Sequence, residues 1–391
     1  MSDNLSELLG RKGVQENLFD KLGNLAKPKG APSEEAMAKL ADEFLIGKSN
    51  AFGTASFYDF LKPENKGKKA YVCNGTACVC AGTQNKVIES LKTHFAADEI
   101  GHMTCLGRCH ENSAFHYDGK NYSGEALQNL RDIIKSDTDQ NQDSYNIKAS
   151  GKQILTQPFT NIEDYYQPFI NALNQDSSEI LEEIKTSNVR GRGGAGFPMG
   201  LKLQFCRNVE NNTKFIICNA DEGDPGAFSD RYLLEHQPHS VLFGMLISGY
   251  VTHANYGILY IRAEYPESVK IVQNAINDIS DAGLIGKNIN GSGFDFEFKI
   301  IQAQGSYICG EETALINSIE GQRPEVRVRP PFPAQKGLFN KPTTVNNVET
   351  TLEGRYLMDN ELTFTNDKPY VIYGYMAVGD PDGSTAKTLT I

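Results

Sequence analysis

Four cysteines in two pairs constrain this chain more than any other feature of its sequence. Cys73 and Cys78 lie in Cys-Asn-Gly-Thr-Ala-Cys, and Cys105 and Cys109 lie in Cys-Leu-Gly-Arg-Cys. Thiolates from two such loops can hold a [2Fe–2S] cluster, with two thiolates for each iron, or a tetrahedral zinc ion. Zinc ribbons favour two intervening residues in each pair, which neither pair has, so the spacing favours iron–sulfur over zinc without excluding zinc.

Composition narrows the class of protein further. The 391 residues are 39% hydrophobic, enough for two or three domains with their own cores, and the net charge of −11 disfavours nucleic acid and anionic membranes as partners. The polar start predicts no secretory signal, and the most apolar stretch, 240–251, is too short to span a bilayer. Eight cysteines are too few for a disulfide scaffold in a chain of this length. We therefore expect a cytoplasmic protein with a metal or redox site.

The first part of the chain has the element order of a thioredoxin-like domain. Helical periodicity at 14–25 and 34–45 predicts a small helical lead-in. The segments that follow are an extended run at 69–72, a helix at 83–95, short strands near Met103 and at 115–117 with an Asp118-Gly119 hairpin signal, and a helix at 125–134. A charged, Gln/Asn-rich linker at 136–146 follows.

The second part alternates strand-like and helical segments from about Gln157. They are 215–218, 240–251, 257–261, 267–281, 296–302 and 311–319. Such alternation predicts an α/β sheet that is covered by helices.

A glycine-rich loop, Gly191-Arg192-Gly193-Gly194-Ala195-Gly196, begins this second part. It matches G-x-G-x-x-G, but 184–190 does not have the pattern of a buried strand, so the match is weak as a Rossmann signal. No Gly-Lys-Ser/Thr follows, which excludes a Walker A motif. The loop offers exposed N–H groups before a helix that we expect from Pro198, a suitable place for a phosphate or a flavin ring.

The cysteine pattern resembles a known domain. The segment from about Ala55 to Ile134 is similar to the thioredoxin-like [2Fe–2S] subunit of respiratory complex I and its relatives. This resemblance implies that Cys73, Cys78, Cys105 and Cys109 are the cluster ligands, with Gly75 and Gly107 letting the backbone turn around the cluster. Cys80 falls outside the matched spacing and is most simply a buried small residue, although it is the alternative ligand.

Three further stretches place polar side chains at loops that begin helices: 218–228, 307–315 and 344–350. Together with the glycine loop they resemble the FMN- and NADH-binding subunit of complex I, of NAD-reducing hydrogenases and of NAD-linked formate dehydrogenases. The resemblance implies FMN contacts at Gly191, Arg192, Gly193, Lys202, Asn219, Asp221, Tyr307, Gly310, Glu311, Asn346 and Asn347. It implies an NADH site lined by Phe197, Phe205, Asp224, Glu312 and Phe332.

Residue chemistry fits these roles, but each residue also has an ordinary structural interpretation. Glu311, Glu312 and Asp221 at helix starts can simply complement helix dipoles. The three phenylalanines are more often core residues, and Lys202 alone would usually be a solvated surface charge. The remaining cysteines, Cys206, Cys218 and Cys309, have no paired partner in sequence and are expected to be packed.

Two features depart from the family pattern. Many relatives have Glu at the position of Asp224 and Trp at the position of Leu203, which predicts altered contacts near the nicotinamide and lighter packing near Lys202. The family also continues through a ubiquitin-like domain into a helical domain with a [4Fe–4S] motif, whereas no cysteine follows Cys309 here. We therefore suspect a truncated chain in which 370–376 and 387–391 begin the ubiquitin-like domain.

The predicted fold class is α/β: a helical lead-in with a thioredoxin-like domain, a Rossmann-like FMN/NADH-binding α/β domain, and the start of a truncated ubiquitin-like domain. The expected boundaries are 1–62 for the lead-in, 63–140 for the thioredoxin-like [2Fe–2S] domain, 141–156 for the linker, 157–365 for the FMN/NADH-binding domain and 366–391 for the incomplete segment.

The resemblance implies an FMN- and iron–sulfur-dependent NADH:acceptor oxidoreductase, a diaphorase module. NADH would give a hydride to FMN, and electrons would then pass singly to iron–sulfur centres of other subunits in a hydrogenase, formate dehydrogenase or complex I-like assembly. No side-chain acid, base or nucleophile is expected. The alternative is a non-catalytic structural or assembly chain with a zinc-bearing thioredoxin-like domain.

Overall fold

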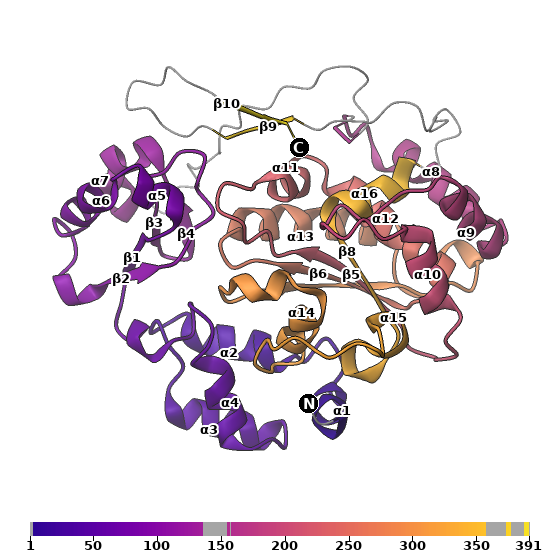
Figure 1. The fold of residues 1–391 in the computed structure, drawn as a ribbon, viewed down its shortest axis with the longest axis horizontal. Helices are drawn as coiled ribbons and strands as arrows, with labels where there is room; N and C mark the ends of the chain where they lie inside the picture. The colour runs from indigo at the N-terminus through magenta and orange to yellow at the C-terminus, as the bar shows by residue number, and fades with distance from the viewer. Residues whose placement is uncertain (1–2, 136–154, 157, 357–372, 377–386, 391) are drawn as a thin grey trace.

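The computed structural model describes residues 3–135, 155–156, 158–356, 373–376 and 387–390. Figure 1 shows a smaller unit built on strands β1 to β4 beside a larger unit built on strands β5 to β8, with the N-terminal helices packed below the larger sheet. The predicted linker at 136–146 lies outside the described residues.

The helical lead-in consists of α1 (Asp3–Gly10), α2 (Leu18–Ala26), α3 (Glu34–Glu43) and α4 (Lys48–Ala55). The predicted helix at 14–25 begins four residues late, at Leu18, because the side chain of Asn17 caps α2 by accepting hydrogen bonds from Phe19 N and Asp20 N. The lead-in packs on the larger unit: Phe19 and Leu22 share a core with strand residues such as Ile258. Ser6 Oγ also donates to Glu320, at 2.6 Å. The lead-in therefore completes one face of the larger sheet.

The smaller unit has the strand order β2-β1-β3-β4, with β1 (Ala70–Cys73) and β2 (Ile100–Met103) parallel. Strands β3 (Phe115–Tyr117) and β4 (Lys120–Tyr122) are antiparallel and turn at Asp118 and Gly119, whose φ angles are 49° and 74°. These positive angles suit the Asp-Gly hairpin that the sequence predicts. The helices are α5 (Thr76–Cys80), α6 (Gln84–Leu91) and α7 (Leu130–Lys135). The predicted helix at 125–134 is wrong in its first half, because Gly124–Asn129 forms a 3₁₀-helix before α7 begins.

The larger unit is a four-stranded parallel sheet with the order β7-β6-β5-β8. Its strands are β5 (Phe215–Ala220), β6 (Tyr256–Ile261), β7 (Glu297–Gln302) and β8 (Thr343–Asn347). The helices are α8 (Ile162–Ala172), α9 (Ser177–Thr186), α10 (Met199–Arg207), α11 (Ser229–His236), α12 (Pro238–Thr252), α13 (Pro266–Asp281), α14 (Glu312–Ile319), α15 (Pro333–Lys336) and α16 (Val348–Tyr356). The predicted alternation of strands and helices is confirmed, and the parallel order brings the carboxyl ends of the strands to one edge.

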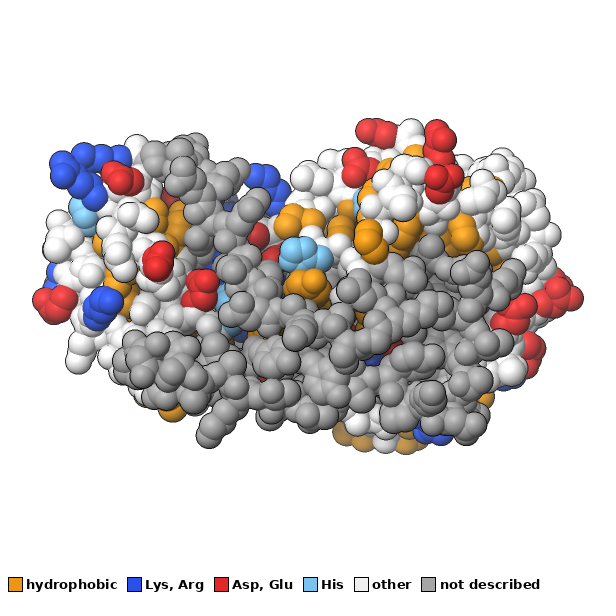
Figure 2. Space-filling view, turned by 90° about the horizontal axis from the view of Figure 1, so that it is seen from above, with side chains coloured by type: hydrophobic (Ala, Val, Ile, Leu, Met, Phe, Trp, Pro, Cys, Tyr) orange, Lys and Arg blue, Asp and Glu red, His pale blue; other side chains and the backbone are white. Residues whose placement is uncertain are grey.

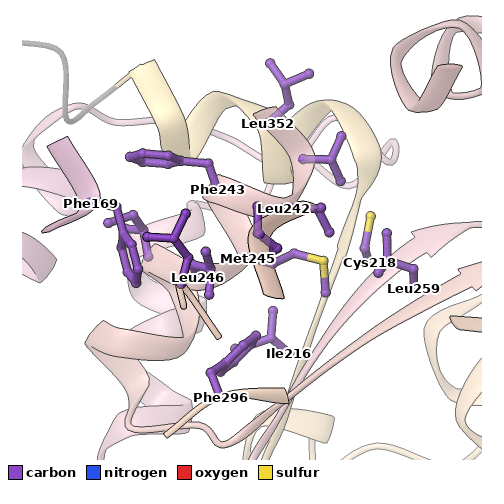
Figure 3. Close-up of a cluster of buried hydrophobic side chains, with 14 of the residues drawn as sticks. Phe169, Ile216, Cys218, Leu242, Phe243, Met245, Leu246, Leu259, Phe296 and Leu352 are labelled. Atoms are coloured by element: carbon purple, nitrogen blue, oxygen red, sulfur yellow. The ribbon is translucent and has the colours of Figure 1, made fainter. Parts of the chain in front are cut away.

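Helix α12 is the centre of the larger core. Figure 3 shows Leu242, Phe243, Met245 and Leu246 of this helix pointing among residues of the sheet and of neighbouring helices, and all four are fully buried. The helix is apolar on every side, as expected for one that is enclosed by other elements. It packs against α16, which directly follows β8. This packing holds the end of β8 in place at the edge where the candidate site lies.

One glycine allows this close approach of α12 to α16. A Cβ atom placed on Gly244 would lie 1.8 Å from the backbone oxygen of Thr351. Gly244→Ala is therefore expected to lower the free energy of unfolding by about 3 kcal/mol, because neither helix backbone can move away without repacking the core. Urea denaturation measures this. Gly53→Ala is the control: Gly53 lies inside α4 with nothing within 4 Å of such a Cβ atom, so a gain of up to ~1 kcal/mol is expected.

At the end of the chain, β9 (Tyr373–Met376) and β10 (Lys387–Thr390) pair as antiparallel strands. They coincide with the two runs that the sequence assigns to a ubiquitin-like domain, and the rest of 366–391 lies outside the described residues. Among the described residues, no helix combines the length and hydropathy that crossing a membrane requires. The domain boundaries given above stay predictions.

Candidate functional site

The four motifs of the second unit meet at the carboxyl edge of its sheet. Asn219 at the end of β5 donates from Nδ2 to the backbone oxygen of Gly310, at 2.9 Å, and so joins the β5 loop to the loop before α14. A Cβ atom placed on Gly193 would lie 3.8 Å from Cβ of Asn347, which brings the glycine loop beside the end of β8. These segments are far apart in the sequence, and the sheet topology unites them.

The glycine loop (residues 191–196) projects from a narrow base. Gly191 N donates to Phe197 O at 2.9 Å, and Met199 N donates to Val189 O at 2.9 Å. Arg192 anchors the loop to α16: its Nε atom lies 2.9 Å from Glu353 Oε1, and its backbone N donates to Thr350 Oγ1 at 2.8 Å. The base is therefore fixed, while residues 192–195 stay exposed and open to a ligand.

Lys202 is held inside this site. Its Nζ atom donates to the backbone oxygen of Val345, at 2.8 Å, and lies 3.8 Å from Glu312 Oε2. Burial lowers the pKa of the Lys202 ammonium group, and the Glu312 carboxylate acts in the opposite direction. The interpretation of Lys202 as a solvated surface charge is therefore wrong. A half-buried cation at this edge suits an anionic cofactor.

Asp221 has a buried carboxyl group beside the same loop. Its backbone N donates to Asn219 Oδ1 at 3.1 Å, and among the described residues its Oδ2 atom has no hydrogen-bond partner. Burial raises the pKa of Asp221 to about 8, against the attraction of Arg262. An unsatisfied buried carboxyl is costly, so it indicates a polar group that the protein part alone does not supply.

The raised pKa predicts how stability depends on pH. Asp221 in the folded protein keeps its proton up to about pH 8, whereas in the unfolded chain it loses it near 3.8. The contribution of Asp221 to the free energy of unfolding is therefore fully present below pH 3.8 and is lost as the pH rises through about 8. Asp221→Asn should flatten the fall in the free energy of unfolding between about pH 5 and pH 8, by at most about 1.4 kcal/mol per pH unit. Urea denaturation of the cofactor-free chain at both pH values tests this, with exposed Asp98→Asn as the control.

Two adjacent acidic residues have different surroundings. Glu311 caps α14 by accepting hydrogen bonds from Thr313 N at 2.8 Å and Ala314 N at 2.9 Å, so the helix-dipole interpretation holds for this residue. Glu312 caps no helix N–H group and faces Arg329, with 2.7 Å between Oε1 and Nη1, while Nη2 of the same arginine lies 3.3 Å from Glu311 Oε1. Arg329 and Glu353 belong to the site but were not found from the sequence, where no spacing distinguishes them from other surface charges.

The aromatic residues are presented to solvent. The exposed fractions are 40% for Phe197, 50% for Phe205, 54% for Phe332 and 68% for Tyr307. The rings of Phe197 and Phe205 are 6.3 Å apart between centroids, and Tyr307 Oη donates to Asp224 Oδ1 at 2.7 Å. The interpretation of the three phenylalanines as core residues is wrong. Exposed rings at the rim of a polar site offer faces on which bases can stack.

Two further residues of the predicted FMN site, Asn346 and Gly310, lie near the same sheet edge. Asn346 is buried on β8 and pairs in register with Cys218 of β5. Gly310 lies where a Cβ atom would be 3.2 Å from the backbone oxygen of Asp221. Cys206, Cys218 and Cys309 are buried, as predicted.

The four paired cysteines lie together in the smaller unit. Cys73 ends β1, Cys78 lies in α5, and the other two flank the loop that follows β2. The Sγ atoms of Cys105 and Cys109 are 3.9 Å apart, and the Cys73 thiol lies within hydrogen-bonding range of Cys78 and Cys105. The neighbouring thiols of Cys109 and Cys73 lower the pKa of Cys105, and Cys73 lowers the pKa of Cys78 to about 7. Neighbouring thiols and burial raise the pKa of Cys73 and of Cys109, so each cysteine pair combines one thiol of lowered pKa with one of raised pKa.

Backbone N–H groups surround the thiols. Gly75 N donates to Cys73 Sγ at 3.3 Å, and Gly107 N donates to Cys105 Sγ at 3.4 Å. Such bonds orient thiolate ligands and stabilise their charge. A [2Fe–2S] cluster requires only two thiolates at each iron, and the two cysteine pairs fit that demand.

The environment of Cys80 differs from the one that its sequence predicts. It is exposed, not a buried small residue. Helix α5 contains both Cys78 and Cys80, and two residues along an α-helix are about 200° apart around its axis. With Cys78 facing inward, Cys80 must face outward.

Side chains of different kinds gather on different parts of the visible surface. Figure 2 shows the molecule from above, with hydrophobic and acidic side chains on the larger unit and basic side chains gathered at the outer end of the smaller unit.

The fold and the two sites define an α/β protein that combines a thioredoxin-like cysteine centre with a nucleotide site at the edge of a parallel sheet. Residues 184–353 match the family described as the Nuo51 FMN-binding domain, and residues 10–137 match the thioredoxin-like [2Fe–2S] ferredoxin family. Two separate segments of the chain are thus similar to these two families, which confirms the resemblance stated from its sequence. FMN and a [2Fe–2S] cluster, two of the three expected cofactors, are those for which these families are named, and the third is NADH.

Curated relatives are redox proteins by name. The chain is 50% identical over 186 residues to an NADH-quinone oxidoreductase component of Aquifex aeolicus, covering 47% of this chain and 43% of that protein. It is 42% identical over 214 residues to the alpha chain of the NAD-reducing hydrogenase HoxS of Cupriavidus necator, covering 54% and 34%. The matched parts thus span less than half the length of these relatives.

A solved structure has the same fold over most of the chain. It is an NAD+-reducing [NiFe]-hydrogenase in the H2-reduced state, matched with a TM-score of 0.76 at 28% identity, and the match covers 92% of this chain and 65% of that one. The match extends across both units, so the predicted fold class is confirmed.

Proposed function

We propose that this chain is the NADH dehydrogenase (diaphorase) module of a larger redox complex, an NADH:acceptor oxidoreductase. The observation that carries this proposal is the meeting of the four motifs at one sheet edge beside Lys202 and the unsatisfied carboxyl of Asp221. The relatives are named as components of NADH-quinone oxidoreductase and of NAD- or NADP-reducing hydrogenases, which supports the same reaction class.

In this proposal the flavin part of the site is formed by the glycine loop and the strand ends. Backbone N–H groups of residues 191–193 bind phosphate, Lys202 balances its charge, and Asn219, Asn346 and Asn347 hydrogen-bond hydroxyl oxygens. Asp221, protonated at neutral pH through its raised pKa, donates a hydrogen bond to the cofactor. Bound FMN supplies the chemistry, accepting a hydride and releasing electrons singly.

The dinucleotide part lies at the exposed rim. Phe197, Phe205 and Phe332 stack on the bases, and the carboxylates of Asp224 and Glu312 orient ribose hydroxyls. Tyr307 holds Asp224 in place through its hydroxyl. The paired cysteines hold the [2Fe–2S] cluster, and further subunits of a hydrogenase, formate dehydrogenase or complex I-like assembly in the cytoplasm receive the electrons.

Reconstitution tests this function. The purified chain, incubated with FMN and then freed of unbound flavin, should retain about one FMN and should lose its visible flavin absorbance when NADH is added anaerobically. A folded chain that leaves FMN fluorescence anisotropy unchanged contradicts the proposal. Stoichiometric zinc without iron in an anaerobic preparation would favour the non-catalytic alternative.

A further inference from the structure

The cysteine loop (residues 105–109) lies directly against the larger unit. Asn121 Nδ2 donates to Leu106 O at 3.2 Å and to Glu264 O at 2.8 Å, and so joins this loop to the segment after β6. Gly107 has φ +69°, and a Cβ atom there would lie 2.7 Å from the Tyr265 ring. Only glycine fits here, so the backbone of the loop packs directly on the Tyr265 ring of the larger unit.

Two fully buried arginines meet at this contact, one from each unit. Arg108 lies between the two cysteines of the loop, and its Nη2 atom is 3.0 Å from Glu267 Oε1 at the start of α13. Arg231 of α11 reaches the same carboxylate, with 3.7 Å between Nη2 and Oε2. It also donates from Nη1 to the backbone oxygen of Gly107, at 3.2 Å. Glu267 therefore links the Arg108 guanidinium group of the cysteine loop to helix α11 of the larger unit, through Arg231.

Buried ion pairs of this kind contribute more to geometry than to net stability. Desolvation of both partners offsets most of their attraction, whereas loss of one partner leaves a buried charge unpaired. The planar fork of arginine also restricts the directions from which a carboxylate can bind. The arrangement thus favours one relative position of the two units.

A series of contacts leads from this interface to the flavin edge, the carboxyl edge of the larger sheet where we propose that FMN binds. Arg262, which directly follows β6, donates from Nη1 to the backbone oxygen of Glu222, which adjoins Asp221. Its Nη2 atom lies 3.0 Å from Glu264 Oε1, and Glu264 is the residue whose backbone oxygen Asn121 binds. One short chain of contacts therefore connects the β5 loop to the cysteine loop.

We propose that Arg108 is a positioning residue that, through Glu267 and Arg231, fixes the cysteine loop at a set distance from the flavin edge of the larger unit. The geometric part of this inference stands on the contacts above, and its consequence for electron passage rests on the proposed function. The rate of a reaction between two fixed groups depends on how they are positioned, so a loosened loop should slow reduction of the cluster without affecting the flavin.

Glu267→Gln tests this in the full reconstituted chain. It keeps the size of the side chain but removes the charge that faces both arginines. Hydrogen exchange at the amides of residues 106–109 should become about 10-fold faster or more, because the loop opens more readily. After mixing with NADH, the flavin should bleach at an unchanged rate, while the cluster absorbance should fall about 10-fold more slowly. Arg108→Lys, which keeps the buried charge without the planar fork, should show the same pattern and serves if Glu267→Gln does not fold.

Glu89→Gln is the matched control, because Glu89 forms an exposed ion pair with Lys92 on the smaller unit, away from this contact. Unchanged exchange in the folded variants would overturn the docking role of Arg108. Faster exchange with unchanged cluster reduction would overturn the positioning role. If the unmodified chain shows no flavin bleaching, the proposed function fails, and the exchange measurement alone still decides whether Arg108 fixes the loop.

Discussion

Cys105→Ser should abolish the electron paramagnetic resonance signal of the reduced [2Fe–2S] cluster, and Cys73→Ser and Cys109→Ser should do the same. Each removes one of the four thiols that the smaller unit gathers around β1 and the cysteine loop. Serine is a poor ligand for iron at neutral pH because its hydroxyl stays protonated, so one iron of the cluster would keep a single thiolate. Iron analysis and the low-temperature spectrum of anaerobically reconstituted protein measure the loss.

Cys80→Ser is the matched control for this prediction. Cys80 lies two residues from Cys78 on the same short helix, but it is exposed and on the opposite face. Its substitution should leave the iron content and the signal unchanged. Loss of the signal in Cys80→Ser with retention in Cys78→Ser would mean that Cys80 is the ligand, and that α5 turns when the cluster binds.

Most strands, helices and turns could be predicted because the sequence patterns that specify them are local. The Asp118-Gly119 hairpin, the strands at 215–218 and 257–261 and the helix at 267–281 follow from turn chemistry and periodicity. The meeting of the motifs could be anticipated as well, since the carboxyl ends of parallel strands share one edge. The helix expected at 125–134 was half wrong because periodicity does not distinguish a 3₁₀ turn from the first turns of an α-helix.

The charged partners could not be predicted, because they come from distant segments. Glu353 pairs with Arg192 across 161 residues, and Glu267 pairs with Arg108 from another unit. Neither pair has a spacing signature. Composition also misjudged Lys202 and the phenylalanines, since burial at a ligand site inverts the usual preference for charged residues outside and aromatic residues inside. Such inversions are themselves typical of functional sites.

Glu312→Gln should separate the two halves of the nucleotide site. Glu312 faces the rim, 2.7 Å from Arg329, whereas its neighbour Glu311 caps α14. The helix should therefore stay intact in this variant, and FMN should bind as in the unmodified chain. Hydrogen bonds to a charged group contribute about 1.5–3 kcal/mol, so the NADH concentration for half-maximal flavin reduction should rise about 10-fold to 100-fold.

The two carboxylates differ in what they already contact. Glu311 uses one oxygen for the helix N–H groups, which fixes it toward α14, and its other oxygen lies 3.3 Å from Arg329. Glu312 accepts from no helix N–H group, and its closer pair with Arg329, at 2.7 Å, is one that a ribose diol can replace. Exposed Glu325→Gln, in the segment that leads to Arg329, is the control and should reduce its flavin at ordinary NADH concentrations. Equal loss of FMN binding and NADH reduction in Glu312→Gln would mean that the carboxylate supports the flavin through Lys202, 3.8 Å away, and that the dinucleotide contacts lie elsewhere on the rim.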